Sequence, residues 1–277
     1  MPAVTATLAL VIFAAGAVSG SLGALLGLGG GVFLVPFLNL VLGFPFTVAA
    51  AISLTTVIAT SSSVSAGRAG QQLINMKLGM LLEVATAAGS FLGGITAQLI
   101  AQSILQKLFG FVAALVALIM LTRLRRRNVI LDPSVDPGVL GGRFYERESG
   151  GMVAYRVKRL PVAIAASFVA GNVSSLLGIG GGIIKVPVLN AWCGVPLRAA
   201  AATSAFMIGV TATAGATIYY GRGQLEPALA AAAVLGVQFG SWGGMRFGAA
   251  AWAKWLKVQM AGLLFIVSAM MFMRGGR

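Results

Sequence analysis

The 277-residue sequence contains no histidine, and Cys193 is its only cysteine. These absences exclude metal sites built from histidine or several cysteines, and they exclude an intramolecular disulfide. Only six residues are acidic, and charged residues make up 9% of the chain. Since the apolar segments hold no histidine, cysteine pair or carboxylate pair, an integral membrane enzyme is disfavoured. No cofactor is predicted.

Apolar residues and glycine dominate the composition. Hydrophobic residues form 58% of the sequence, 38 residues are glycine, and the mean hydropathy is +0.94. Soluble domains carry roughly 25% charged residues and far less apolar sequence. The composition therefore predicts an all-α polytopic membrane protein. We expect it to lie in a cytoplasmic membrane of the bacterial type.

The net charge of +14 is unevenly distributed. Nine of the twenty basic residues lie between Arg123 and Arg159. In a membrane protein this pattern indicates a cytoplasmic loop rather than a nucleic-acid partner, with anionic membrane lipids as a second contact. The chain is thus predicted to divide into a first transmembrane repeat (1–122), a basic linker (123–160) and a second repeat (161–277).

Part of the linker alternates apolar and polar residues on both sides of Ser149-Gly150-Gly151. This alternation predicts a small β-hairpin at 143–158. A linker without strands is the alternative, because a two-stranded hairpin is marginally stable alone.

The two apolar halves share a repeated motif. The run GSLGALLGLGGGVFLVPFLN at 20–39 returns as GNVSSLLGIGGGIIKVPVLN at 171–190, with an offset of 151 and eleven of twenty residues identical. The same offset pairs Gly89 and Gly93 with Gly240 and Gly244, whose four-residue spacing is typical of close helix packing in lipid. A duplicated break in a hydrophobic segment is typical of transporters built from internal repeats.

Each half contains five apolar blocks, of which the second (32–44 and 183–194) is too short for a full crossing of about 20 residues. If these short blocks enter the membrane and return to the same side, the chain has eight crossings and the repeats are parallel. If they cross, there are ten and the repeats are inverted. Basic residues do not separate the two topologies. We favour inverted repeats, because they suit alternating access.

Each glycine cluster lets the backbone leave the helix and turn its amides towards a cavity. The helix that follows presents unpaired amides and the positive end of its dipole, so two such ends favour an anion. Tight helix packing is the alternative role of these glycines. The predicted backbone contributors to binding are Gly29, Gly30, Gly31, Gly180, Gly181 and Gly182.

The duplicated G-x-GGG-x3-VP-x-L pattern, the paired apolar blocks and the basic central loop resemble the sulfite exporter TauE/SafE family, also called toluene sulfonate uptake permeases. The resemblance covers nearly the whole chain. It implies a membrane transporter for sulfur-containing anions such as sulfite, sulfonates or sulfoacetate. It implies no direction of transport.

Two charged residues stand inside apolar blocks. Lys185 replaces Leu34 of the first repeat, and it would supply a point charge for an oxyanion unless it snorkels to the interface. Glu83 is the only carboxylate in such a block, and it is a candidate for proton coupling or for pairing with a basic side chain such as Lys185. An ordinary interfacial position is its alternative role.

Several polar side chains are further candidates for lining the substrate site, although hydroxyls in such helices often only bond to the helix itself. They are Asn39, Ser53, Thr56, Asn190, Thr203 and Ser204.

The sequence therefore predicts a secondary transporter with one anion held between two glycine-rich breaks. An anion channel and a membrane scaffold remain the alternatives. A proton or sodium ion could drive transport, and the oligomeric state is open.

Overall fold

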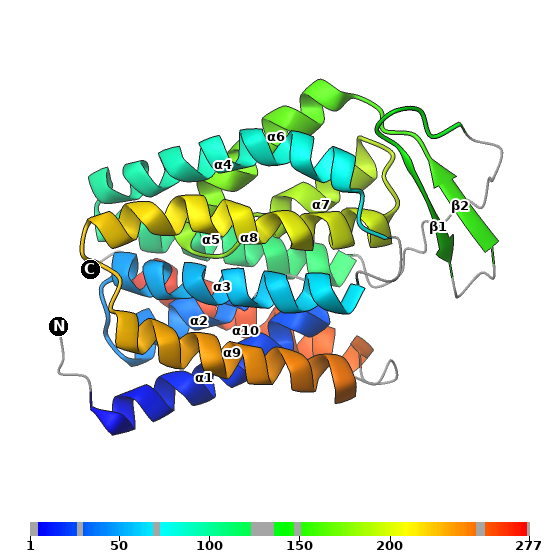
Figure 1. Cartoon of the computed structure of the whole chain (residues 1–277). Coiled ribbons are helices and arrows are strands. Elements are labelled where there is room, and N and C mark those ends of the chain that lie inside the picture. Colours follow the sequence, from blue (N-terminus) through cyan, green and yellow to red (C-terminus); the bar gives the residue numbers. More distant parts are fainter. Residues whose placement is uncertain are drawn as a thin grey trace.

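The computed structural model describes residues 5–26, 30–68, 73–122, 136–146, 151–247 and 253–275, which form a helical bundle with one small hairpin (Figure 1). The first half contains α1 (Ala6–Leu26), α2 (Gly31–Pro36), the π-helical turn η1 (Phe37–Val41), α3 (Phe46–Arg68), α4 (Met76–Leu99) and α5 (Gln102–Thr122). The second half contains α6 (Leu160–Leu177), α7 (Gly182–Ala191), α8 (Leu197–Gly221), α9 (Pro227–Phe247) and α10 (Ala253–Arg274).

Six helices of the described part are long and apolar enough to cross a membrane, namely α1, α3, α4, α5, α6 and α8. The two short apolar blocks of the sequence form α2 with η1 and α7, which are too short for that criterion. The all-α architecture expected from composition is thus confirmed.

Helix packing repeats itself between the halves. Helix α1 packs along α9, and α6, its equivalent in the second half, packs along α4. Gly89 of α4 faces the Phe168 carbonyl, and Gly240 of α9 faces the Ala17 carbonyl, which is the same contact at the offset of 151. A β-carbon at either glycine would collide with the neighbouring backbone, so these glycines allow the helices to approach closely, as predicted.

Two pairs of equivalent helices, α5 with α10 and α3 with α8, run in opposite directions. On α5 and α10, Ser268 donates to the Gly110 carbonyl at 2.7 Å, while Gly275 packs against the Ser103 carbonyl, so residue numbers rise on one helix as they fall on the other. Helices α3 and α8 cross the middle of the bundle, and the colours of Figure 1 show that they also run antiparallel.

The strands β1 (Gly142–Glu146) and β2 (Gly151–Tyr155) pair antiparallel, with Gly142 opposite Tyr155. The hairpin lies at one end of the bundle, and both termini lie at the other (Figure 1). Phe144 and Val153 are buried against the ends of α4 and α8. The described hairpin is therefore packed onto the membrane helices rather than standing apart from them.

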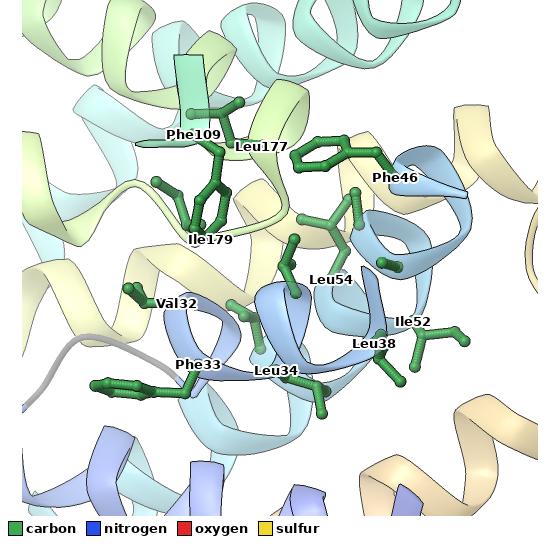
Figure 2. Packing of buried hydrophobic residues seen from close by; sticks show 14 of the residues in the cluster. Val32, Phe33, Leu34, Leu38, Phe46, Ile52, Leu54, Phe109, Leu177 and Ile179 are labelled. Carbon is green, nitrogen blue, oxygen red and sulfur yellow. The ribbon is translucent and has the colours of Figure 1, made fainter. Parts of the chain in front are cut away.

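One apolar cluster brings the two glycine breaks into the same core. Val32 follows the first break and Ile179 lies within the second, and both pack with Leu54 of α3 and Phe109 of α5 (Figure 2). The short helices are thus held in the centre of the bundle.

Candidate functional site

The second break is fully described and takes its shape from glycine. Helix α6 ends where Gly178 adopts φ 71°, and Gly180 adopts φ 74°, a left-handed conformation that other residues rarely take. Gly181 then precedes α7, and its carbonyl accepts from the Lys185 amide at 3.2 Å. The break therefore places Lys185 in the first turn of α7.

The first break has the same form where it is described. Gly30 precedes α2, and its carbonyl accepts from the amides of Phe33 and Leu34, both at 3.2 Å. Gly30 packs against Ser19, as Gly181 packs against the equivalent Ala170. Gly29 lies outside the described residues.

The two breaks touch each other. Ser53 of α3 donates to the Gly178 carbonyl at 2.6 Å, and Gly31 packs against both groups. A β-carbon at Gly31 would lie 2.5 Å from the Gly178 oxygen and 2.6 Å from the Ser53 hydroxyl. Only glycine fits here, so the contact between the breaks depends on the absence of a side chain.

A buried charged cluster lies beside the second break. Lys185 is 1% exposed, and its ammonium donates to the Thr211 hydroxyl of α8 at 3.3 Å. The Thr211 hydroxyl lies 2.8 Å from Oε1 of Glu83 on α4, and the Lys185 nitrogen lies 3.8 Å from Oε2. Three helices from both halves thus meet at one cation and one carboxylate. The structure brings together the two charged residues singled out in the sequence, and Lys185 does not snorkel.

The positions equivalent to this cluster carry no charge. The offset of 151 relates Lys185 to Leu34, Thr211 to Thr60, and Glu83 to Val234. Leu34 and Thr60 are buried, and the Thr60 hydroxyl bonds back to the Thr56 carbonyl of its own helix at 2.8 Å. Each charge is therefore replaced by an apolar side chain at the equivalent position of the opposite repeat.

The two asparagines lie at the outer ends of the short helices. Asn39 donates to the Phe44 carbonyl at 2.8 Å, and Asn190 donates to the equivalent Val195 carbonyl at 3.0 Å. Gln106 also donates to the Asn39 side chain at 3.0 Å. Both side chains thus hold the turns that lead into α3 and α8.

The four predicted hydroxyl residues divide by their contacts. Ser53 joins the two breaks, and Thr56 bonds back to the Ser53 carbonyl at 2.7 Å. Thr203 accepts from the Asn75 amide at 2.9 Å, at the start of α4. The Ser204 hydroxyl is buried and has no hydrogen-bond partner among the described residues.

Two polar residues of the structure were not among the predicted site residues. Thr211 bridges the charged pair. The sequence signal that could have found it is its equivalence to Thr60 at the offset of 151. Asn75 caps α4 by accepting from the Leu78 amide at 3.0 Å and donates to Leu140 and Tyr155 of the central segment. Burial raises the pKa of the Tyr155 hydroxyl, and the Asn75 hydrogen bond lowers it by less.

A separate groove of about 540 Å³ lies between α1, α2, η1 and α10. Its lining is almost entirely apolar and includes Phe33, Phe37 and Leu263. An anion would find no charge there, so the groove is not part of the candidate site.

Comparison with known proteins assigns the family. The family described as "Sulfite exporter TauE/SafE" matches residues 12–271. The chain belongs to this family. The probable membrane transporter protein YunE of Bacillus subtilis is 27% identical over 237 residues, which cover 83% of this chain and 85% of YunE. A probable membrane transporter protein of Methanocaldococcus jannaschii is 28% identical over 210 residues, 74% of this chain and 69% of that protein. No solved structure matches the chain.

Family membership confirms the resemblance seen in the repeated motif. Together with the apolar helices, it identifies the protein as an integral membrane transporter, and membership in a transporter family implies transport rather than catalysis.

Proposed function

We propose that the protein is a secondary transporter that carries small sulfur-containing anions, of the sulfite, sulfonate or sulfoacetate type, across the cytoplasmic membrane. The observation that carries the proposal is the ammonium group of Lys185, buried beside the second glycine break. A charge within a membrane is costly and is retained where it serves a function. The family's description supports a sulfur oxyanion as the substrate.

The proposed site centres on Lys185 and the N-terminal turn of α7, where helix amides and the dipole favour negative charge. Gly180, Gly181 and Gly182 supply this turn, and the first break lies against it through Gly31 and Gly178. Ser53 donates to the Gly178 carbonyl, and its equivalent Ser204 has a buried hydroxyl without a hydrogen-bond partner among the described residues, so both are proposed to line the site. Gly29, Gly30, Thr56 and Thr203 remain predicted contributors, whereas Asn39 and Asn190 are proposed to hold the turns after the short helices.

We also propose that the halves are inverted repeats that exchange roles in alternating access. The antiparallel packing of α5 with α10 supports inversion. The other contacts agree, because α1 of the first repeat packs on α9 of the second, while the equivalent α6 packs on α4 of the first. Rocking of one repeat against the other would open the central site first to one face of the membrane and then to the other.

The proposed orientation places the central segment 123–160 in the cytoplasm. Its basic residues support this orientation, since positive charge is enriched in cytoplasmic loops. Helical repeats 1–122 and 161–277 flank it. Glu83 is the proposed proton-coupling group, and sodium coupling is the alternative tested by omitting either gradient from reconstituted vesicles.

Ligand-induced thermal stabilisation tests the anion site. The purified protein is heated with sulfite, methanesulfonate, sulfoacetate or acetate, because a ligand that binds the folded state raises the unfolding temperature. We expect a sulfur anion to raise it in the protein and in a Leu34→Met control, and to have no effect on Lys185→Met. Stabilisation of Lys185→Met equal to that of the unaltered protein would remove Lys185 from the site. Saturable, gradient-driven uptake into vesicles separates a carrier from a channel.

A further inference from the structure

We propose that Glu83 is a built-in competitor for the substrate on Lys185, so that each anion that binds places one proton on Glu83. The inference rests on the proposed anion site and deepens it. It makes the protein a carrier of one monovalent anion together with one proton.

The contact between the two charges is incomplete. Oε1 of Glu83 has the Thr211 hydroxyl as a partner, but Oε2 has no hydrogen-bond partner among the described residues and stands 3.8 Å from the ammonium. The ammonium has three donors, and Thr211 is the hydrogen-bond partner seen for it in the described part of the chain. The pair is close enough to attract and too far apart for a direct hydrogen bond. Lys185 therefore keeps donors for a second oxyanion.

The described residues around Lys185 supply no other charge to balance it. Helix α6 has no ionisable side chain over residues 160–177. On α8, Arg198 lies in the first turn, and Tyr219 and Tyr220 lie two turns beyond Thr211. On α4 the remaining ionisable residue is the exposed Lys77, and from the hairpin Tyr155 reaches Asn75, two turns before Glu83. Glu83 is therefore the one carboxylate that the described helices place against this cation.

Charge balance then links binding to protonation. An unpaired charge inside the bundle is very costly, so Lys185 keeps one negative partner at all times. When a monovalent anion takes that place, the Glu83 carboxylate would be left unpaired beside a second negative charge. It becomes neutral by accepting a proton on one carboxyl oxygen from the water on the side from which the anion entered. The Thr211 hydroxyl can both donate and accept, so it can hydrogen-bond to the charged and to the neutral carboxyl.

The same balance predicts which anions fit. With Lys185 positive and Glu83 either paired or protonated, the site is neutral when it is empty and neutral when it holds a monovalent anion. A divalent anion would leave one uncompensated negative charge in an apolar bundle, which Coulomb repulsion and desolvation disfavour. Monovalent anions such as methanesulfonate and hydrogen sulfite are thus preferred over divalent anions such as sulfate and fully ionised sulfoacetate.

The absence of both charges from the equivalent positions supports the proposal. Leu34 in the first repeat and Val234 in the second stand at the positions equivalent to Lys185 and Glu83, so neither charge is duplicated. A cation that served only to attract anions would need no carboxylate, and a carboxylate that served only to carry protons would need no lysine.

The experiment measures methanesulfonate binding to the purified protein by titration calorimetry, in buffers that differ in their heat of ionisation. Methanesulfonate stays a monovalent anion across the working pH range, so any proton taken up belongs to the protein. We expect uptake of one proton per anion at alkaline pH, with an affinity that falls about tenfold per pH unit there. Sulfate should bind at least about tenfold more weakly than methanesulfonate.

Glu83→Gln keeps the shape and the hydrogen bond to Thr211 but cannot exchange a proton. At neutral pH, where the unaltered protein still takes up one proton, it should bind methanesulfonate without proton uptake and with an affinity that changes little with pH. At alkaline pH Lys185, which has lost its partner in this variant, can itself take up a proton when the anion binds. Glu226→Gln, which removes a carboxylate that lies just before α9, is the matched control and should behave like the unaltered protein. Should Glu83→Gln fail to fold, the proton count of the unaltered protein still decides the matter.

Binding of methanesulfonate without proton uptake by the unaltered protein overturns the inference and leaves the proposed function intact. Proton uptake that persists in Glu83→Gln at neutral pH also overturns it, as does tighter binding of sulfate than of methanesulfonate. If methanesulfonate, sulfite and sulfoacetate all fail to bind, the proposed function itself fails.

Discussion

Lys185 and Leu34 occupy equivalent positions in the two repeats, and both side chains are completely buried in the bundle. The repeats therefore share a backbone plan but differ in chemistry at the same point of their short helices. Duplication explains the shared plan, with its glycine breaks and exchanged helix contacts. The lysine explains why only one half carries the charge that an anion would need.

The buried ion pair of Lys185 and Glu83 should affect the stability of the folded protein. Lys185→Met leaves Glu83 without its cation, and we expect the free energy of unfolding to fall by about 3 kcal/mol, because the removal of one partner from a buried ion pair is strongly destabilising. Adding Glu83→Gln should restore most of the loss, since two neutral side chains need no partner. Thermal unfolding in detergent measures both variants. A double variant no more stable than Lys185→Met alone would show that the pair does not act as a unit.

The close contact between the two glycine breaks predicts that a side chain at Gly31 lowers both stability and anion binding. Gly31→Ala would put a β-carbon 2.5 Å from the Gly178 carbonyl oxygen, and neither group can move without shifting a helix. We expect a loss of about 1–3 kcal/mol, typical of overpacking, and weaker methanesulfonate binding. Gly262→Ala is the matched control, because nothing lies within 4 Å of its β-carbon position and alanine favours the helix. Equal stability of the two variants would refute the close contact.

Docking of the hairpin depends on Asn75, whose side chain both caps α4 and holds the central segment. Asn75→Asp keeps the oxygen that caps the helix but loses the donor to the Leu140 carbonyl and the Tyr155 hydroxyl. Asn75→Ala loses both functions and should cost about 1 kcal/mol more than the aspartate variant, the usual worth of an N-cap. Hydrogen exchange of residues 151–155 should rise in both variants. Unchanged exchange in Asn75→Asp would mean that burial of Phe144 and Val153 alone holds the hairpin.

The sequence was sufficient for features that repeat or that are local. The offset of 151 located both breaks, and block length predicted that the helices after them would be short. It also showed that Lys185 departs from the repeat. These features can be read from the sequence because they depend on neighbouring residues and on apolar composition. Insertion into a membrane directly requires long apolar segments.

Contacts between distant helices could not be predicted in the same way. Glu83 pairs with Lys185 because α4, α7 and α8 meet, and the sequence left several roles open for that carboxylate. Thr211 resembles Thr213 and Thr217 on the same helix, both of which only bond back to it. Hydroxyls in a membrane helix have this local alternative, so the one that bridges a charged pair is known only from packing.

Asn39 and Asn190 give a test that separates a structural role from a binding role. Asn39 exchanges hydrogen bonds with two partners and is buried, whereas Asn190 has one such bond and is partly buried. We expect Asn39→Ala to lose about 2 kcal/mol and Asn190→Ala about 1 kcal/mol, as buried groups of the turn lose their partners. Methanesulfonate affinity should remain the same in both, measured by calorimetry beside thermal unfolding. If affinity falls tenfold while stability is kept, the two amides reach the substrate, and the outer turns belong to the anion path.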